Sequence, residues 1–361
     1  MTTVVLLSVL FLAFFNGAND NFKGVATIYG SRLASYRTAL AWGCVTTAAG
    51  AMLAPVLAPG LIGMFKAKGL VPDAVAAAPA FMSSACLAAA LTVAIATRIG
   101  MPVSTTHALT GGLVGAGFIA AGSDLNLGIL GKSFVLPLLI GPFAAAFLAS
   151  VAALGMKWTR LDAEKTTRLE ADVKTQLDKA KQQLEGDLRE AVPANASGDA
   201  ATSPPVKPSL ALNVFHFLSG GAVSFARGVN DAPKLMALGF AAGALGGGKF
   251  VSVGVVTVAM TVGGILMSRR VAETMSTKIS QIEPATGVIA NTTAAVLVIL
   301  GSIYKLPLST THVTTGGIVG VGATRRSVDW GVIGKIGLAW ITTLPTGVAC
   351  GAVLYLIISR L

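Results

Sequence analysis

The chain has 361 residues, of which 53% are hydrophobic and only 12% are charged, and its formal net charge is +11. A soluble domain would carry about twice that charged fraction, and the long apolar runs lack the period of two that strands of a membrane β-barrel show. No basic groove with aromatic platforms accompanies the positive charge, so nucleic acid is not an expected partner. The composition predicts an all-α polytopic membrane protein.

Five apolar segments fill the first 156 residues. We expect them at about 3–30, 36–58, 76–98, 101–121 and 128–156, long enough to cross a hydrocarbon core. The first is interrupted at Asn16–Asn21 and has no Lys or Arg before it, which favours a membrane helix over a cleaved signal peptide. Five crossings put the two ends of this first membrane repeat, 1–156, on opposite sides.

A charged segment follows the first repeat. Residues 157–209 hold nine basic and nine acidic side chains, with leucines at helical spacing and then a run rich in Pro, Ser and Ala. They predict a helical and then flexible linker. Lys and Arg near the segment ends are more numerous on the linker's side, so the positive-inside rule makes it cytoplasmic in a multi-pass protein of the cell membrane.

The second repeat, 210–361, follows the same plan. Its apolar segments are expected at about 210–240, 249–268, 284–302, 305–323 and 331–358, the first interrupted near Arg227–Lys234. Because it follows an odd number of crossings, this half must enter the membrane in the opposite direction. The predicted fold is two inverted-topology repeats of about five to six membrane segments each, with broken or re-entrant helices, as in many secondary transporters.

Two sequence stretches occur once in each half. Residues 100–117 and 305–322 align without a gap and share 11 of 18 positions, including a Ser-Thr-Thr-His run. Asn16–Lys23 likewise matches Gly228–Lys234 through an Asn-Asp pair and a lysine three residues later. These matches indicate an internal duplication.

The Ser-Thr-Thr runs have the chemistry of an oxyanion site. Pro102 and Pro307 mark places where a helix can begin, and a helix N-terminus attracts anions through its unpaired N–H groups and its dipole. Either copy alone would more often be a helix cap followed by packing glycines. Two copies indicate an anion cradle, whose expected oxyanion-binding residues are Ser104, Thr105, Thr106, Ser309, Thr310 and Thr311.

Several ionisable residues lie within the apolar segments, where a charge is costly and marks a functional site by default. An Asn-Asp pair in an unwound helix offers a hard cation a carboxylate, an amide oxygen and backbone carbonyls; a structural ion pair, such as Asp20 with Lys23, is the competing interpretation. The expected binding residues for a coupling cation are Asn19, Asp20, Asn230, Asp231 and Glu283, with the two aspartates as metal ligands if the ion is Na⁺. Candidates for an anion or proton role are Lys23, Lys234, Arg227, His107 and His312.

An aspartate beside an oxyanion repels it unless a cation lies between them or the carboxyl group is protonated. Cation and anion would therefore bind and move together, which predicts a symporter for Na⁺ or H⁺ with no other cofactor. Three further functions stay open. They are a sulfate or other tetrahedral oxyanion permease, a divalent-metal transporter using Asp20, Asp231, His107 and His312, and an intramembrane hydrolase using Ser104 with His107.

At these motifs the chain resembles the PiT family of inorganic phosphate transporters, whose signature is a duplicated G-x-N-D run and a duplicated P-x-S-x-T-H run. The resemblance covers nearly all of the chain outside the linker. It implies a Na⁺- or H⁺-coupled phosphate symporter that is a homodimer. Together with the inverted repeat, this leads us to expect an importer that works by alternating access and is not an enzyme. The resemblance also implies that Asp20 and Asp231 lie at cation sites and that the Ser-Thr-Thr runs hold the phosphate oxygens.

The chain departs from the family pattern after each Asn-Asp pair. The familiar members continue with small and apolar residues, whereas this chain continues with Asn21-Phe22-Lys23 in one half and Ala232-Pro233-Lys234 in the other. We expect the two lysines to alter anion choice or to replace a cation. Glu283 matches an acidic position of the family, but Ala78 stands at the equivalent position of the first repeat.

Overall fold

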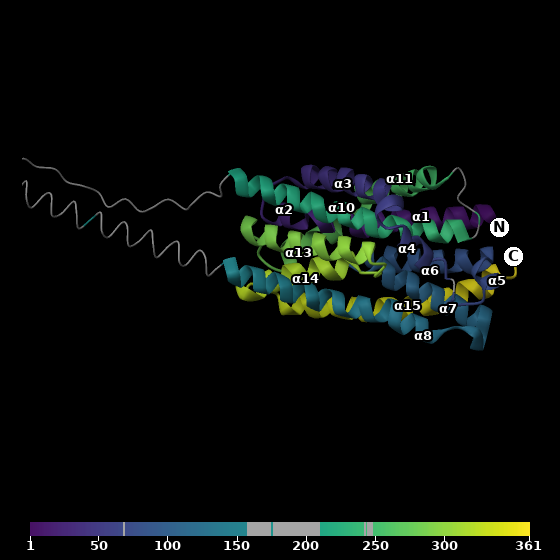
Figure 1. The fold of residues 1–361 in the computed structure, drawn as a ribbon. Helices are drawn as coiled ribbons and strands as arrows, with labels where there is room; N and C mark the ends of the chain where they lie inside the picture. Colours follow the sequence, from purple (N-terminus) through teal and green to yellow (C-terminus); the bar gives the residue numbers. More distant parts are fainter. Residues whose placement is uncertain (68, 157–174, 176–209, 242, 244–247) are drawn as a thin grey trace, which may run out of the picture.

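The chain folds into a bundle of helices that lie mostly along one direction (Figure 1). This computed structural model describes residues 1–67, 69–156, 175, 210–241, 243 and 248–361. Both termini lie at one end of the bundle, and the second half begins at the other end (Figure 1). The predicted linker 157–209 falls, apart from Thr175, outside the described residues.

The first half contains four long helices, one shorter helix that begins with polar residues, and several short helical elements that connect them. The long helices are α1 (Thr2–Asp20), α3 (Tyr36–Leu57), α6 (Pro79–Arg98) and the helix Leu136–Met156; α7 (Thr105–Ala121) is shorter. The short elements are η1 (Lys23–Val25), α2 (Ala26–Gly30), α4 (Pro59–Met64), α5 (Asp73–Ala76), η2 (Gly122–Asp124), α8 (Leu127–Leu130) and η3 (Gly131–Val135).

The second half repeats this order of elements. It consists of α10 (Leu210–Ala241), α11 (Lys249–Met267), α12 (Arg269–Glu273), η4 (Thr274–Lys278), α13 (Pro284–Ile303), α14 (Thr310–Thr324) and α15 (Trp330–Ile358). Helices α6 and α13 begin 205 positions apart and end 205 positions apart, which matches the spacing of the duplicated sequence. The repeated order and the placement of the chain ends agree with the predicted inverted repeat, whose opposite orientation in a membrane stays a prediction.

The two halves interlock through the glycines of the duplicated stretch. A Cβ atom on Gly115 of α7 would lie 1.9 Å from the carbonyl oxygen of Val348 in α15, and one on Gly320 of α14 would lie 2.3 Å from that of Ala146 in the helix Leu136–Met156. Both distances are impossible for a side chain, so only glycine permits these backbones to approach. Each short helix is thus packed against the last helix of the opposite half.

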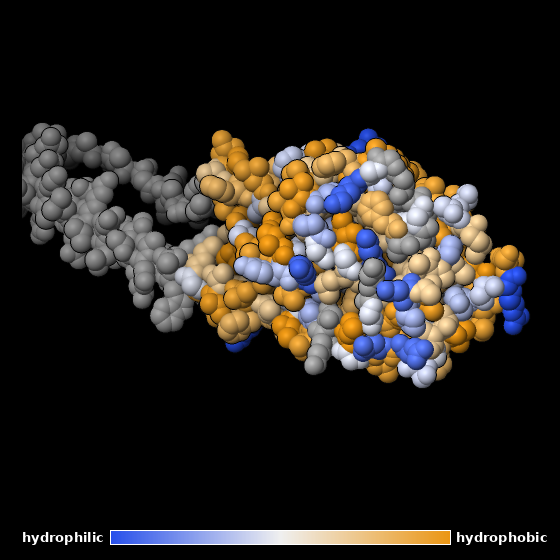
Figure 2. All heavy atoms as spheres, turned by 45° about the vertical axis from the view of Figure 1, so that its right-hand side comes forward, coloured by the Kyte–Doolittle hydropathy of each residue, from blue (hydrophilic) through white to orange (hydrophobic). Residues whose placement is uncertain are grey.

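Apolar side chains cover much of the surface of the bundle, and on the face in Figure 2 they are interspersed with hydrophilic ones. Large apolar side chains such as Phe143, Phe147 and Ile341 are 67–73% exposed. Exposure of this much apolar surface is unfavourable in water and favourable in contact with lipid tails. Seven helices among the described residues are long and apolar enough to cross a membrane. The all-α polytopic membrane fold is therefore confirmed.

Three sequence predictions about helix boundaries were wrong. Helix α1 continues to Asp20, so the chain turns only at Asn21–Phe22, at the end of the polar run, and Asn16–Asp20 stay helical. Helix α10 is unbroken over 32 residues and passes through Asn230, Asp231 and Pro233. A proline removes one backbone hydrogen bond, and helices packed among neighbours tolerate that loss.

The third correction concerns the duplicated stretch. Helices α7 and α14 begin at Thr105 and Thr310, three residues after Pro102 and Pro307, because Ser104 and Ser309 act as their N-caps. At about 1.5 Å per residue, α7 and α14 are roughly 23–26 Å long, shorter than a hydrocarbon core. The residues that precede them, Pro102–Ser104 and Pro307–Ser309, are buried non-helical backbone, in agreement with the expected broken helices.

Candidate functional site

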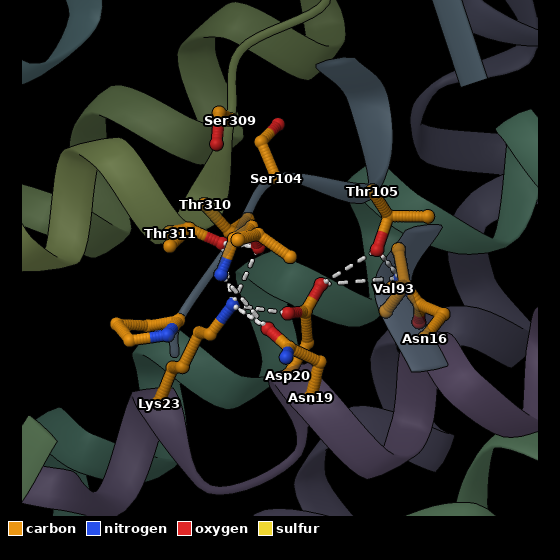
Figure 3. Close-up of polar contacts among 12 residues, drawn as sticks. Asn16, Asn19, Asp20, Lys23, Val93, Ser104, Thr105, Ser309, Thr310 and Thr311 are labelled. Carbon is orange, nitrogen blue, oxygen red and sulfur yellow. Dashed lines mark hydrogen bonds and ion pairs between the residues drawn. The ribbon is translucent and has the colours of Figure 1, made fainter. Parts of the chain in front are cut away.

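A cluster of buried polar and charged side chains lies where the two halves meet. It is formed by the last turn of α1 and the η1 turn that follows, the middle of α10, and the starts of α7 and α14. Five ionisable residues in this cluster are each at most 3% exposed: Asp20, Lys23, Arg227, Asp231 and Lys234. Figure 3 shows the Asp20 side of the cluster.

The Lys23 ammonium group is surrounded by four oxygen atoms. It donates to Asn19 Oδ1 at 2.7 Å, to the Val103 carbonyl oxygen at 2.9 Å and to Thr311 Oγ1 at 2.6 Å. It also forms an ion pair with Asp20 Oδ1. In Figure 3 its amine points into the group made by Asp20, Asn19 and Thr311. The structural ion pair that we expected as the competing interpretation is therefore present, and its network reaches across to the second repeat.

The Lys234 ammonium group has the equivalent partners. It donates to Thr106 Oγ1 at 2.8 Å and to the Leu308 carbonyl oxygen at 3.3 Å, and it pairs with Asp231 Oδ1 at 3.2 Å. By the gapless alignment, Thr106 corresponds to Thr311 and Leu308 corresponds to Val103. Each lysine thus binds a threonine hydroxyl of the other half and the backbone carbonyl of a segment that precedes α7 or α14.

The two asparagines of the Asn-Asp pairs hold the non-helical segments in place. Asn19 accepts from the Val103 N–H at 3.1 Å and donates to the Met101 carbonyl oxygen at 3.1 Å. Asn230 donates to the Leu308 carbonyl oxygen at 3.0 Å. The backbone carbonyls near the lysines therefore come from the segments before α7 and α14, and not from an unwound Asn-Asp helix as the sequence had suggested.

The centre of the cluster is asymmetric. Asn16 donates to Asp20 Oδ2 at 3.1 Å and to Asp231 Oδ2 at 3.3 Å, so it links the two carboxylates. The equivalent position of the second half is Arg227, which donates to Asn16 Oδ1 at 2.7 Å and pairs with Asp231 Oδ2 at 3.3 Å. Asp231 therefore has two cationic partners, whereas Asp20 has one.

The six predicted phosphate-binding residues are all buried, but they have different partners. Ser104 and Ser309 accept from the backbone N–H groups of His107 and His312 and so cap their helices. Thr105 Oγ1 donates to Asp20 Oδ2 at 3.3 Å, and Thr106 and Thr311 accept from the two lysines. Thr310 lies beside Thr311 at the start of α14 (Figure 3).

The two histidines meet across the boundary between the halves. The rings of His107 and His312 stack with centroids 4.6 Å apart, and Trp340 of α15 stacks on His312 at 3.8 Å. His312 Nδ1 lies 2.6 Å from Ser309 Oγ, whereas His107 Nδ1 is buried with no hydrogen-bond partner. The Ser–His contact that a hydrolase would need thus occurs only in the second copy and links neighbours on one helix turn.

Glu283 is the one predicted site residue that lies away from the cluster. It is the N-cap of α13 and pairs with Arg325, and its side chain is 55% exposed. The structure therefore brings together four of the five predicted cation-binding residues and gives Glu283 the contacts of a surface ion pair and a helix cap. A metal-binding group of three or more His, Cys, Asp or Glu side chains does not occur among the described residues.

Several residues that contact the cluster were not predicted, among them Asn16 and Trp340. Asn16 could have been found, because it lies four residues before Asp20 on one helical face and aligns with Arg227. Trp340, which donates to the Pro102 carbonyl oxygen at 3.0 Å, comes from a helix outside both duplicated stretches. No sequence signal could have identified it.

The arrangement offers an anion a positively charged and polar environment. Lys23, Lys234 and Arg227 carry three positive charges, against two negative charges on Asp20 and Asp231, so the formal charge of the five residues is +1. Two helix N-termini and the hydroxyls of the Ser-Thr-Thr runs adjoin these groups. Ammonium, guanidinium and hydroxyl donors together match the acceptor oxygens of a tetrahedral oxyanion.

Comparisons with known proteins agree with this chemistry. Residues 16–351 match a family described as "Phosphate transporter family". A protein of Rhizobium meliloti (strain 1021) named "Probable low-affinity inorganic phosphate transporter" is 29% identical, over 96% of this chain and 93% of its own length. A protein of Bacillus subtilis (strain 168) with the same name is 25% identical, over 100% and 98%. A solved structure titled "The sodium-dependent phosphate transporter" has the same fold, with a TM-score of 0.74, 23% identity and coverage of 100% of this chain and 99% of its own.

Proposed function

Because the chain belongs to the phosphate transporter family, we propose that it imports inorganic phosphate across the cell membrane by alternating access, in symport with Na⁺ or H⁺. The observation that carries this proposal is the convergence of two Ser-Thr-Thr helix starts on one buried cluster of net positive charge. The repeated order of elements supports alternating access, since two equivalent halves can expose one central site to either side in turn.

The two carboxylates favour phosphate over sulfate. Monohydrogen phosphate carries a P–OH group that can donate a hydrogen bond to an ionised carboxylate, whereas sulfate has only acceptor oxygens at neutral pH. Asp20 or Asp231 would therefore bind the one anion and repel the other, and a buried acceptor without a donor is costly. This argument ranks the sulfate permease below the phosphate transporter.

The metal transporter and the hydrolase have less support. A divalent-metal transporter needs carboxylates that are free for the metal, but Asp20 and Asp231 are paired with Lys23, Arg227 and Lys234. The family consists of transporters, which argues against the hydrolase. Dimer formation, the cytoplasmic position of the linker and the direction of transport stay predictions.

Labelled phosphate uptake into proteoliposomes tests the proposal, with imposed Na⁺ or H⁺ gradients and with sulfate or arsenate as competitors. We expect phosphate to accumulate, arsenate to compete well and sulfate to compete weakly. Uptake of sulfate without uptake of phosphate would contradict the proposal.

Two variants test the site itself. Asp20→Asn and Asp231→Asn should each reduce coupled uptake at least tenfold, whereas Asp73→Asn, an exposed residue at the start of α5, should transport normally. Near-normal coupled uptake in either site variant would remove that aspartate from the coupling site.

A further inference from the structure

The oxygen atoms around Lys23 have the composition of a monovalent cation site. They comprise a carboxylate of Asp20, an amide carbonyl of Asn19, a backbone carbonyl of Val103 and a hydroxyl of Thr311. An ammonium group has three hydrogens to donate, yet four oxygens lie around this one. Such a set of hard oxygen ligands, with carbonyls from non-helical backbone, is what transporters use to bind Na⁺.

The second lysine occupies the same kind of position in the other half. Lys234 contacts a carboxylate of Asp231, a backbone carbonyl of Leu308 and a hydroxyl of Thr106. Two equivalent oxygen sites therefore exist, and each contains a lysine nitrogen that lies three residues along the chain from its carboxylate. The aliphatic stems are buried as well, since Lys23 and Lys234 are each 2% exposed.

The two lysine ammonium groups decide the sign of the cluster's net charge. Without the lysines, Asp20 and Asp231 would leave the cluster negative even with Arg227 present, and an oxyanion could bind only after free cations had entered. With the lysines the formal charge is +1, so an anion is attracted before any ion arrives.

Resting on the proposed phosphate transport, we propose that Lys23 and Lys234 are tethered cations. Their ammonium groups fill the two positions that free coupling ions would take, so phosphate transport by this chain requires no Na⁺. Of the two candidate coupling ions, Na⁺ and H⁺, this leaves the proton.

The first measurement uses the wild-type chain. Labelled phosphate uptake into proteoliposomes is compared in NaCl and in choline chloride at equal ionic strength, with the sodium-dependent phosphate transporter of the same fold as the positive control. We expect the two rates to agree within twofold. A tenfold stimulation by Na⁺ would overturn the proposal while leaving phosphate transport intact.

The second measurement asks whether removal of a lysine uncovers a cation site. Lys23→Ala and Lys234→Ala should each lose at least tenfold in uptake in choline chloride, and Na⁺ should raise their unfolding temperature and restore part of the uptake. Wild type and Lys249→Ala, whose lysine is exposed at the start of α11, should show no such response. If Na⁺ changes neither lysine variant, the oxygens do not form a cation site and the proposal fails.

The two proposals fail in different ways. If the wild-type chain moves no phosphate, the proposed function is wrong, but the effect of Na⁺ on unfolding temperature still decides the role of the lysines. If a lysine variant does not fold, the wild-type comparison in NaCl and choline chloride can still refute the tethered cations.

Discussion

Removing the Lys23 ammonium group should destabilise the fold strongly, because Asp20 would remain as an unpaired buried carboxylate. In the variant Lys23→Met the apolar stem is kept, but Asp20 retains only the neutral partners Asn16 and Thr105. Breaking a buried ion pair by removing one partner costs about 3–5 kcal/mol. A chain of 361 residues unfolding with about 2.1 cal/mol/K per residue loses about 1.3 °C in Tm for each kcal/mol. The expected fall in Tm is therefore about 4–7 °C.

A double-mutant cycle isolates the interaction between the two charges. Asp20→Asn should be somewhat less harmful than Lys23→Met, because the ammonium group keeps Asn19, Val103 and Thr311 as partners. The double variant removes both charges together, so its fall in Tm should be smaller than the sum of the two single falls. The coupling should correspond to about 2 kcal/mol or more.

The assay is thermal unfolding of the purified protein in detergent and choline chloride. The matched control is the pair Arg269 and Glu273, which lie 3.5 Å apart on the surface at 81% and 47% exposure, and whose coupling should be within about 0–1 kcal/mol. Additive effects of Asp20→Asn and Lys23→Met would show that the two charges do not interact, and the reasoning about the cluster would be refuted.

Three further predictions concern packing, capping and Glu283. Gly263→Ala should lower the free energy of unfolding by about 1–3 kcal/mol through overpacking, because the new Cβ would lie 1.8 Å from the Phe14 carbonyl oxygen. The control is Gly254→Ala on the same helix, where a Cβ would meet no atom within 4 Å, so its Tm should be unchanged or slightly raised. Ser104→Ala and Ser309→Ala each remove an N-cap and should lower stability by about 0.5–2 kcal/mol, with the larger loss at Ser309, whose hydroxyl also contacts His312 Nδ1. Hydrolytic activity that Ser104→Ala abolishes and Ser309→Ala does not would instead favour the hydrolase. Glu283→Gln should leave phosphate uptake and its cation dependence unchanged, since the side chain is 55% exposed. A change in cation dependence would show that Glu283 does contribute to cation binding.

Much of the fold could be predicted because, in a membrane protein, a long apolar run indicates where a membrane-spanning helix lies. The apolar runs predicted α3, α6, α11 and α13 to within a few residues. The boundaries at polar motifs failed, because Ser104 and Ser309 place the helix starts three residues after Pro102 and Pro307, and α10 continues past Pro233. Those outcomes depend on caps and neighbouring helices, which a proline or a polar run does not reveal.

The duplication also identified most of the candidate site. Symmetry singled out the Asn-Asp pairs, the lysines and the Ser-Thr-Thr-His runs, and the structure gathers these residues from both halves. Glu283 was included on its charge and on the family pattern alone, and it lies at the surface. Trp340 was missed because it lies in neither repeated motif.

The sequence by itself determined the membrane class, the duplication and the residue types of the site, since these follow from composition and from matching positions within one chain. Only the tertiary structure decided which half supplies each partner. Thr311 contacts Lys23 from 288 positions away, and Thr106 contacts Lys234 from 128 positions away. Such contacts depend on how the glycine-lined helices of the two halves pack together, and no local pattern records that packing.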